Sequence, residues 1–68
     1  MSAARRLLDA PTITADLLAE ILDVRPSLAI AVIVRLMVDG ALYRVAPGEF
    51  ALTPSGRSAA ERDAVRAA

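Results

Sequence analysis

The stretch that decides the fold is PSLAIAVIVRLMVDG, residues 26–40. It begins with a proline, which suits the first position of a helix because the missing N–H is not needed there. It closes with Gly40, the residue type most common just after a helix end. Arg35 is the only charged residue before Asp39. The segment therefore predicts a strongly apolar helix that ends near Asp39.

At about 100° per residue, this helix has two apolar faces. One face is expected to pack against the preceding helices and consists of Ala29, Val32, Ile33, Leu36 and Gly40. The other is a stripe at i, i+4 and i+8, flanked by Met37 and formed by Ile30, Val34 and Val38. Because so short a chain has few residues left to cover the stripe, we expect it to be exposed. The alternative is that the last helix or the N-terminal segment folds over it and makes it ordinary core.

Two shorter helices are predicted before this segment. Residues 3–10 form a short first helix that stops at a proline. Thr14 offers a side-chain oxygen to cap a second helix, whose apolar face is expected to carry Leu17, Leu18, Ile21 and Leu22. Asp23 follows this helix and is expected in the left-handed backbone conformation.

A β-hairpin and a last helix are predicted after Gly40. Residues 42–45 and 50–53 are short β-prone runs, and the Pro-Gly pair between them suits the centre of a type II turn. Tyr43 and Phe50 are expected to pack on the sheet face that meets the helices. The last helix covers residues 54–66 and has a solvated face of Arg57, Glu61, Arg62, Asp63 and Arg66. These elements predict one domain, residues 1–68, that is mainly α with a small β-hairpin (α+β).

Composition argues against several classes of protein. The formal net charge of zero disfavours a domain that holds nucleic acid mainly through phosphates. The chain has no cysteine and no histidine, the usual zinc ligands and proton shuttle. Its carboxylates are scattered at predicted caps and turns, so no enzyme activity, cofactor or metal is expected. No apolar run approaches the ~20 residues of a membrane span, and none suits a signal peptide, which makes a cytoplasmic protein the expectation.

Three segments resemble, in the same order, the winged helix-turn-helix domains of bacterial and phage regulators of the MarR and ArsR types. They are LAEILDVRPS at 18–27, RLMVDGALYR at 35–44 and FALTPSGR at 50–57. The resemblance implies a helix-turn-helix over 14–39, a two-stranded wing over 41–53 and a C-terminal helix over 54–66. It also implies a third helix that lies in the DNA major groove and a wing that reaches phosphates.

The resemblance would place base contacts on the apolar helix, at Ser27, Leu28, Ile30, Ala31, Val34 and Arg35. Only Ser27 and Arg35 carry hydrogen-bonding side chains, whereas aliphatic groups contact at most a thymine methyl. The sequence therefore favours a non-enzymatic regulator-like module, of a kind also encoded by phages, whose third helix binds protein. Its partner would be a second copy of the chain or a host protein, and the predicted interface is Leu28, Ile30, Ala31, Val34, Met37 and Val38.

The alternative function is a DNA-binding transcription regulator that acts as a dimer. Its predicted DNA contacts on the third helix and the wing are Arg25, Ser27, Arg35 and Arg44. A competing interpretation of the three arginines is that they are solvated charges, loosely paired with Asp23, Asp39 or Glu49.

Overall fold

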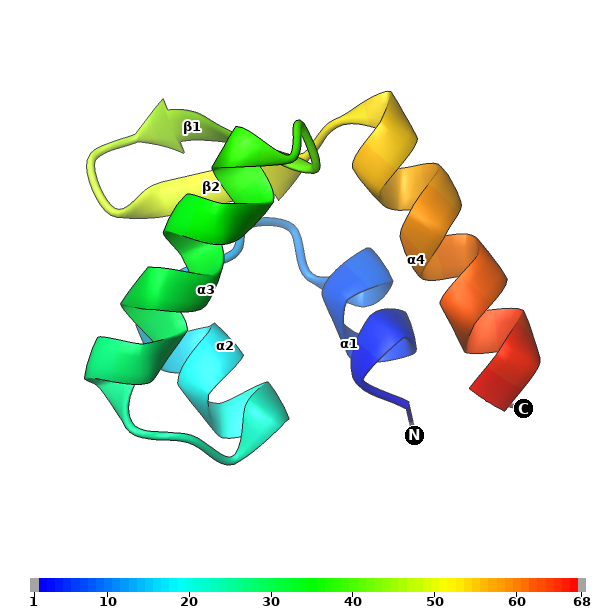
Figure 1. Ribbon diagram of the computed structural model, residues 1–68, viewed down its shortest axis with the longest axis horizontal. Coiled ribbons are helices and arrows are strands. Elements are labelled where there is room, and N and C mark those ends of the chain that lie inside the picture. Colours follow the sequence, from blue (N-terminus) through cyan, green and yellow to red (C-terminus); the bar gives the residue numbers. More distant parts are fainter. Residues whose placement is uncertain (1, 68) are drawn as a thin grey trace.

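The computed structural model describes residues 2–67, which form four helices and a two-stranded antiparallel hairpin (Figure 1). The elements in chain order are α1 (Ala3–Asp9), α2 (Ala15–Leu22), α3 (Pro26–Val38), β1 (Leu42–Ala46), β2 (Glu49–Leu52) and α4 (Pro54–Ala67). The predicted mainly helical α+β class is confirmed. Met1 and Ala68, which the predicted domain 1–68 includes, lie outside the described residues.

Local signals begin and end α2 where the sequence places them. The Thr14 side-chain oxygen accepts the N–H of Leu17 at 3.1 Å and caps the first turn. At the other end, Asp23 has φ 56° and ψ 51°, the predicted left-handed conformation. The Val24 N–H then bonds back to the Ala19 carbonyl at 3.0 Å. This tight turn fixes the angle at which α3 leaves α2.

The end of α3 is set by Gly40, which has φ +78°. Its N–H bonds to the Met37 carbonyl at 3.1 Å, and the Ala41 N–H bonds to the Leu36 carbonyl at 2.8 Å. This pair of hydrogen bonds is the Schellman arrangement, which needs a left-handed residue at the position Gly40 occupies. The turn directs the chain into β1.

The hairpin turns through Pro47 and Gly48, and Gly48 has the positive φ (+74°) that the third position of a type II turn requires. A register shift between Arg44 and Ala46 interrupts the pairing of the two strands. A further β-bridge joins the hairpin to the connection between α1 and α2. The Ile13 N–H donates to the Phe50 carbonyl at 2.7 Å, and the Phe50 N–H returns the bond at 2.8 Å.

Two predictions about the hairpin were wrong. Tyr43 is 50% exposed, whereas Phe50 packs against the core. The register explains the difference: Phe50 lies opposite Arg44, the residue after Tyr43, and successive residues of a strand point to opposite faces. The second strand was predicted to include Thr53 but ends at Leu52. The Thr53 hydroxyl instead accepts the Gly56 N–H at 3.0 Å and caps α4.

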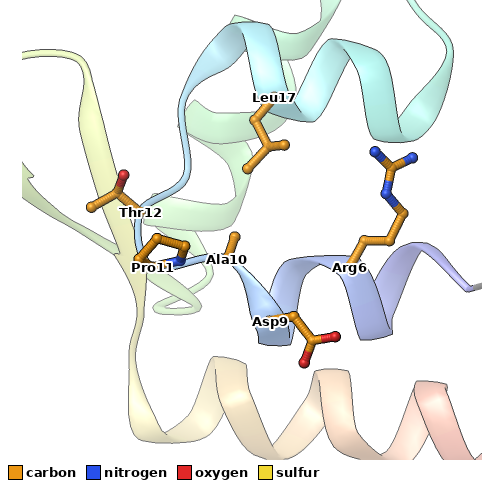
Figure 2. A pocket seen from close by; sticks show the side chains of 6 residues that line it. All are labelled: Arg6, Asp9, Ala10, Pro11, Thr12 and Leu17. Atoms are coloured by element: carbon orange, nitrogen blue, oxygen red, sulfur yellow. The ribbon is translucent and has the colours of Figure 1, made fainter.

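The core is aliphatic and lies between α2, α3 and the hairpin. Its buried members are Ile13, Leu18, Ala19, Ala29, Ile33 and Leu42. The predicted apolar face of α2 was right for Leu18 but wrong for Leu22, which is 38% exposed at the last position of the helix. Leu17 instead points into the space between α2 and α1 (Figure 2).

α4 lies beside α1, on the side of the molecule away from the outer face of α3 (Figure 1). Its buried residues are the small side chains Ala60 and Ala64, together with Gly56. Because α4 packs there, neither it nor α1 covers the stripe Ile30, Val34 and Val38, which remains exposed. The alternative in which these residues are ordinary core is therefore wrong.

Candidate protein-binding surface

The outer side of α3 carries a group of large apolar side chains in contact with solvent. We call it the exposed α3 face, and it consists of Leu28 (49% exposed), Ile30 (54%), Val34 (54%), Met37 (39%) and Val38 (77%). Ala31 is also exposed. The prediction that the stripe would be exposed is confirmed for each of its three members.

Helical geometry makes the central stripe of this surface continuous. Ile30, Val34 and Val38 are spaced by four residues, so their side chains lie one above another on successive turns. α3 has 13 residues, which corresponds to a length of about 20 Å. On the opposite side of the same helix, Ala29 is fully buried and Ile33 is 3% exposed. α3 therefore has an inner apolar face that completes the core and an outer one that does not.

The exposed α3 face offers little for polar recognition. Arg35 lies at its edge, and its Nε donates to Asp39 Oδ2 at 3.3 Å, an i,i+4 pair on the helix surface. The competing interpretation of Arg35, a solvated charge paired with Asp39, is thus confirmed. The side chains of the face itself can bury area against another apolar surface, but they cannot hydrogen-bond a base edge.

The four predicted DNA contacts are all exposed, but they do not form one cluster. Arg25 is the N-cap residue of α3 and Ser27 lies in its first turn, whereas Arg35 lies in the last turn. Ser27 and Arg35 are therefore about 12 Å apart along the helix axis. Arg44 lies on β1. Among residues 2–67, the ion pairs are Arg35–Asp39 and Arg6–Glu20, so Arg25 and Arg44 have no acidic partner there.

Two further exposed apolar side chains, neither of them predicted from the sequence, lie on β1. Tyr43 is 50% exposed and Val45 is 45% exposed. β1 follows α3 directly and contacts it. Strand alternation outward from a buried Leu42 could have indicated Tyr43, but the register shift before Ala46 has no clear signal in the sequence.

A hollow of about 350 Å³ lies between α1 and α2 (Figure 2). Its lining consists of Arg6, Asp9, Ala10, Pro11, Thr12 and Leu17. Arg6 reaches toward α2, where its Nη2 lies 3.6 Å from Glu20 Oε1, while Asp9 points the other way, toward α4. The charged groups thus diverge, and the hollow lacks the converging acid and base that a catalytic site needs.

Within residues 2–67, no three of the carboxylates gather closely enough to hold a metal ion. The helices of this region are also too short or too polar to cross a membrane. No family model, curated protein or solved structure matches the chain. The exposed α3 face is therefore the candidate functional surface.

Proposed function

We propose that the protein is a cytoplasmic, non-enzymatic winged-helix module, of the regulator type, whose exposed α3 face binds a protein surface. The order of elements supports the winged-helix assignment: two helices joined by a tight turn are followed by a hairpin. The Ile13–Phe50 bridge supports it further, because it adds a short third pairing at the base of the hairpin.

The observation that carries the proposal is the exposure of five large apolar side chains along one helix. A helix that is apolar on all sides is normally buried on all sides. Contiguous exposed apolar patches on small proteins commonly mark interaction sites. The sequence of α3 is apolar on nearly all sides. In the structure its outer side chains are nevertheless exposed.

The magnitude of the burial favours protein over DNA as the ligand of α3. Fully burying one Val, Leu or Ile contributes about 1.5–3 kcal/mol. The five side chains are on average about half exposed, so covering them would contribute about 4–8 kcal/mol before the costs of association. DNA would leave most of this area uncovered, because aliphatic side chains contact at most a thymine methyl on a base edge.

DNA binding as a dimeric transcription regulator is the second candidate function. The exposed Arg25 and Arg44, which have no acidic partner among the described residues, support it. If these groups contact phosphates, affinity for long DNA falls with salt, and the logarithmic slope grows by about one per phosphate contact. A gel-shift assay with long DNA at low salt tests this candidate, and the absence of any shift would exclude it.

Photo-crosslinking from a single position tests the proposed function. A benzophenone side chain at Val34 should form covalent adducts with protein, either with a second copy in purified material or with another protein in an extract of the source cells. The matched control is the same probe at Val65, which is 75% exposed but lies on α4. Unlabelled wild-type chain should compete with the adducts at Val34. Equal yields at the two positions, or no protein adduct at Val34, would contradict the proposal.

A charge placed on the surface supplies a second test. Val34→Glu should abolish the adducts formed from a probe at Ile30, because it puts a carboxylate in the centre of the exposed α3 face. It should leave the far-ultraviolet circular dichroism spectrum unchanged, because Val34 is 54% exposed. Val65→Glu is the control and should affect neither measurement. Unfolding caused by Val34→Glu would show that this side chain belongs to the core.

A further inference from the structure

We infer that a hollow between α1 and α4 is a binding site for a small apolar molecule that carries one positive charge, such as an arylalkyl amine. The hollow has a volume of about 240 Å³ and is partly open to solvent. Its two walls are α1 and α4, which lie side by side in the fold (Figure 1). The site is separate from the exposed α3 face, so it goes beyond the proposed function.

Three leucines from three different elements line this hollow. Leu7 lies on α1, Leu36 on α3 and Leu52 on β2. Each of them packs against the buried core but is itself only partly buried. They therefore give the hollow an apolar floor. A ligand bound there would extend the core by removing this area from water.

The hollow exists because α4 supplies only small residues where it faces the three leucines. Gly56, Ala59 and Ala60 line this wall. At Gly56 there is no room for a side chain, since a Cβ would overlap the backbone of Ala41. One turn further along α4, alanines stand where larger side chains would fill the space. The wall is thus held close at one end and leaves a void beyond it.

The size of the hollow fits a molecule with one aromatic ring. An apolar cavity of about 150 Å³ lined by aliphatic and aromatic side chains is large enough to bind benzene. A hollow of about 240 Å³ therefore has room for a ring and a short substituent. An ordered water molecule needs several polar partners, and this largely aliphatic lining is poor in them.

Asp63 determines which substituent the ligand carries. Among the described residues that line the hollow it is the only charged one, and it is exposed, so it lies at the open side. It forms no ion pair within residues 2–67. A carboxylate beside an apolar pocket attracts an ammonium group and repels a carboxylate or a phosphate. The lining therefore selects a small hydrophobic cation over an anion of the same shape.

Three ligands of similar shape test the site on the intact chain. Benzylamine, benzyl alcohol and benzoate carry, in that order, a positive charge, no charge and a negative charge near neutral pH. Binding at millimolar ligand is followed through the NMR methyl signals of Leu7, Leu36 and Leu52. Benzylamine should shift these signals and bind about two- to fivefold more tightly than benzyl alcohol, because the ion pair with Asp63 is exposed. Benzoate should bind most weakly.

Two substitutions with matched controls locate the binding. Asp63→Asn should remove the preference for benzylamine over benzyl alcohol. Glu61→Gln neutralises an exposed carboxylate on another side of the same helix and should keep the preference.

Ala59→Leu should fill the hollow and abolish the binding of every probe. Ala31→Leu adds the same side chain to the exposed surface of α3 and should leave binding unchanged. Circular dichroism checks that each variant is folded. If Ala59→Leu unfolds the chain, Ala59→Val takes its place and should weaken binding.

Leucine methyl signals that no probe shifts at millimolar concentration would overturn the inference. Benzyl alcohol that binds as tightly as benzylamine, or a preference for benzylamine that survives Asp63→Asn, would overturn the cation as ligand. These outcomes leave the proposed function untouched, because Val34 does not line the hollow. Val34→Glu should accordingly leave benzylamine binding unchanged.

Discussion

Two neighbouring residues of α3 provide a direct test of its two-faced character. Ile33 is 3% exposed and belongs to the core, whereas Val34, about 100° further around the helix, is 54% exposed. Replacing each in turn with alanine leaves the helix sequence otherwise the same. The two substitutions should therefore have very different effects on the free energy of unfolding.

The expected magnitudes follow from burial. Ile33→Ala removes buried methyl and methylene groups and leaves a cavity, which costs about 2–5 kcal/mol. Val34→Ala removes two methyl groups that are about half exposed, a loss of roughly 0.7 kcal/mol of burial. Alanine regains about 0.5 kcal/mol through its higher helix propensity. The net effect of Val34→Ala on the isolated chain should lie within about 0.5 kcal/mol of zero.

The assay is urea unfolding followed by circular dichroism at low protein concentration, where association contributes least. Because a chain of this size has a small total stability, Ile33→Ala could leave it unfolded. Ile33→Val, expected to cost about 0.5–1.5 kcal/mol, then supplies the value for the buried side. If Val34→Ala at low concentration costs as much as Ile33→Ala, the reasoning about the exposed α3 face is refuted.

Repeating the measurement at increasing protein concentration separates folding from association. Binding that is specific to the folded state raises its apparent stability by mass action. If the exposed α3 face mediates self-association, the unfolding midpoint of the wild-type chain should rise with concentration, and that of Val34→Ala should rise less. Equal concentration dependence for the two proteins would show that Val34 does not contribute to association.

Three further substitutions test the local features that position α3, each measured by urea unfolding. Thr14→Ala removes the oxygen that accepts the Leu17 N–H and should cost about 1 kcal/mol, whereas Thr14→Ser should retain most of the stability. Asp23→Gly should raise stability by up to about 1 kcal/mol, because glycine adopts the φ of 56° without the strain of a side chain, and Asp23→Ala should lower it. Gly56→Ala should cost about 1–3 kcal/mol or more, since its Cβ would overlap the Ala41 backbone, with Ala41 Cα only 2.9 Å away; the exposed Ser58→Ala in the same helix should have little effect.

The helix ends could be predicted from sequence because each depends on a local signal. Thr14, Asp23, Pro26 and Gly40 act through hydrogen bonds and backbone angles within a few residues of themselves. Pairings between distant segments could not be predicted in the same way. The register shift between Arg44 and Ala46 is one example, because no adjacent residue specifies it.

The packing of α4 on α1 could not be predicted from the sequence either. The residues that α4 buries are Gly56, Ala60 and Ala64, which allow close approach but give no strong apolar periodicity. Where α4 lies decides whether α3 is covered, so the structure was needed to choose between core and surface for Ile30, Val34 and Val38. Helical periodicity alone could show that α3 has a second apolar face, because that property depends only on spacing.

The residue types on the exposed α3 face argue that its apolar character is not a by-product of helix formation. Ile30, Val34 and Val38 are β-branched, and such residues lower helix propensity because their χ1 angles are restricted. On the inner face the burial of Ile33 offsets this effect, but on the outer face of an isolated chain nothing does. α3 also begins without a side-chain hydrogen bond at its N-cap. A surface that stabilises neither the helix nor its contact with water supports the proposed burial against another protein, and that contact would stabilise α3 itself.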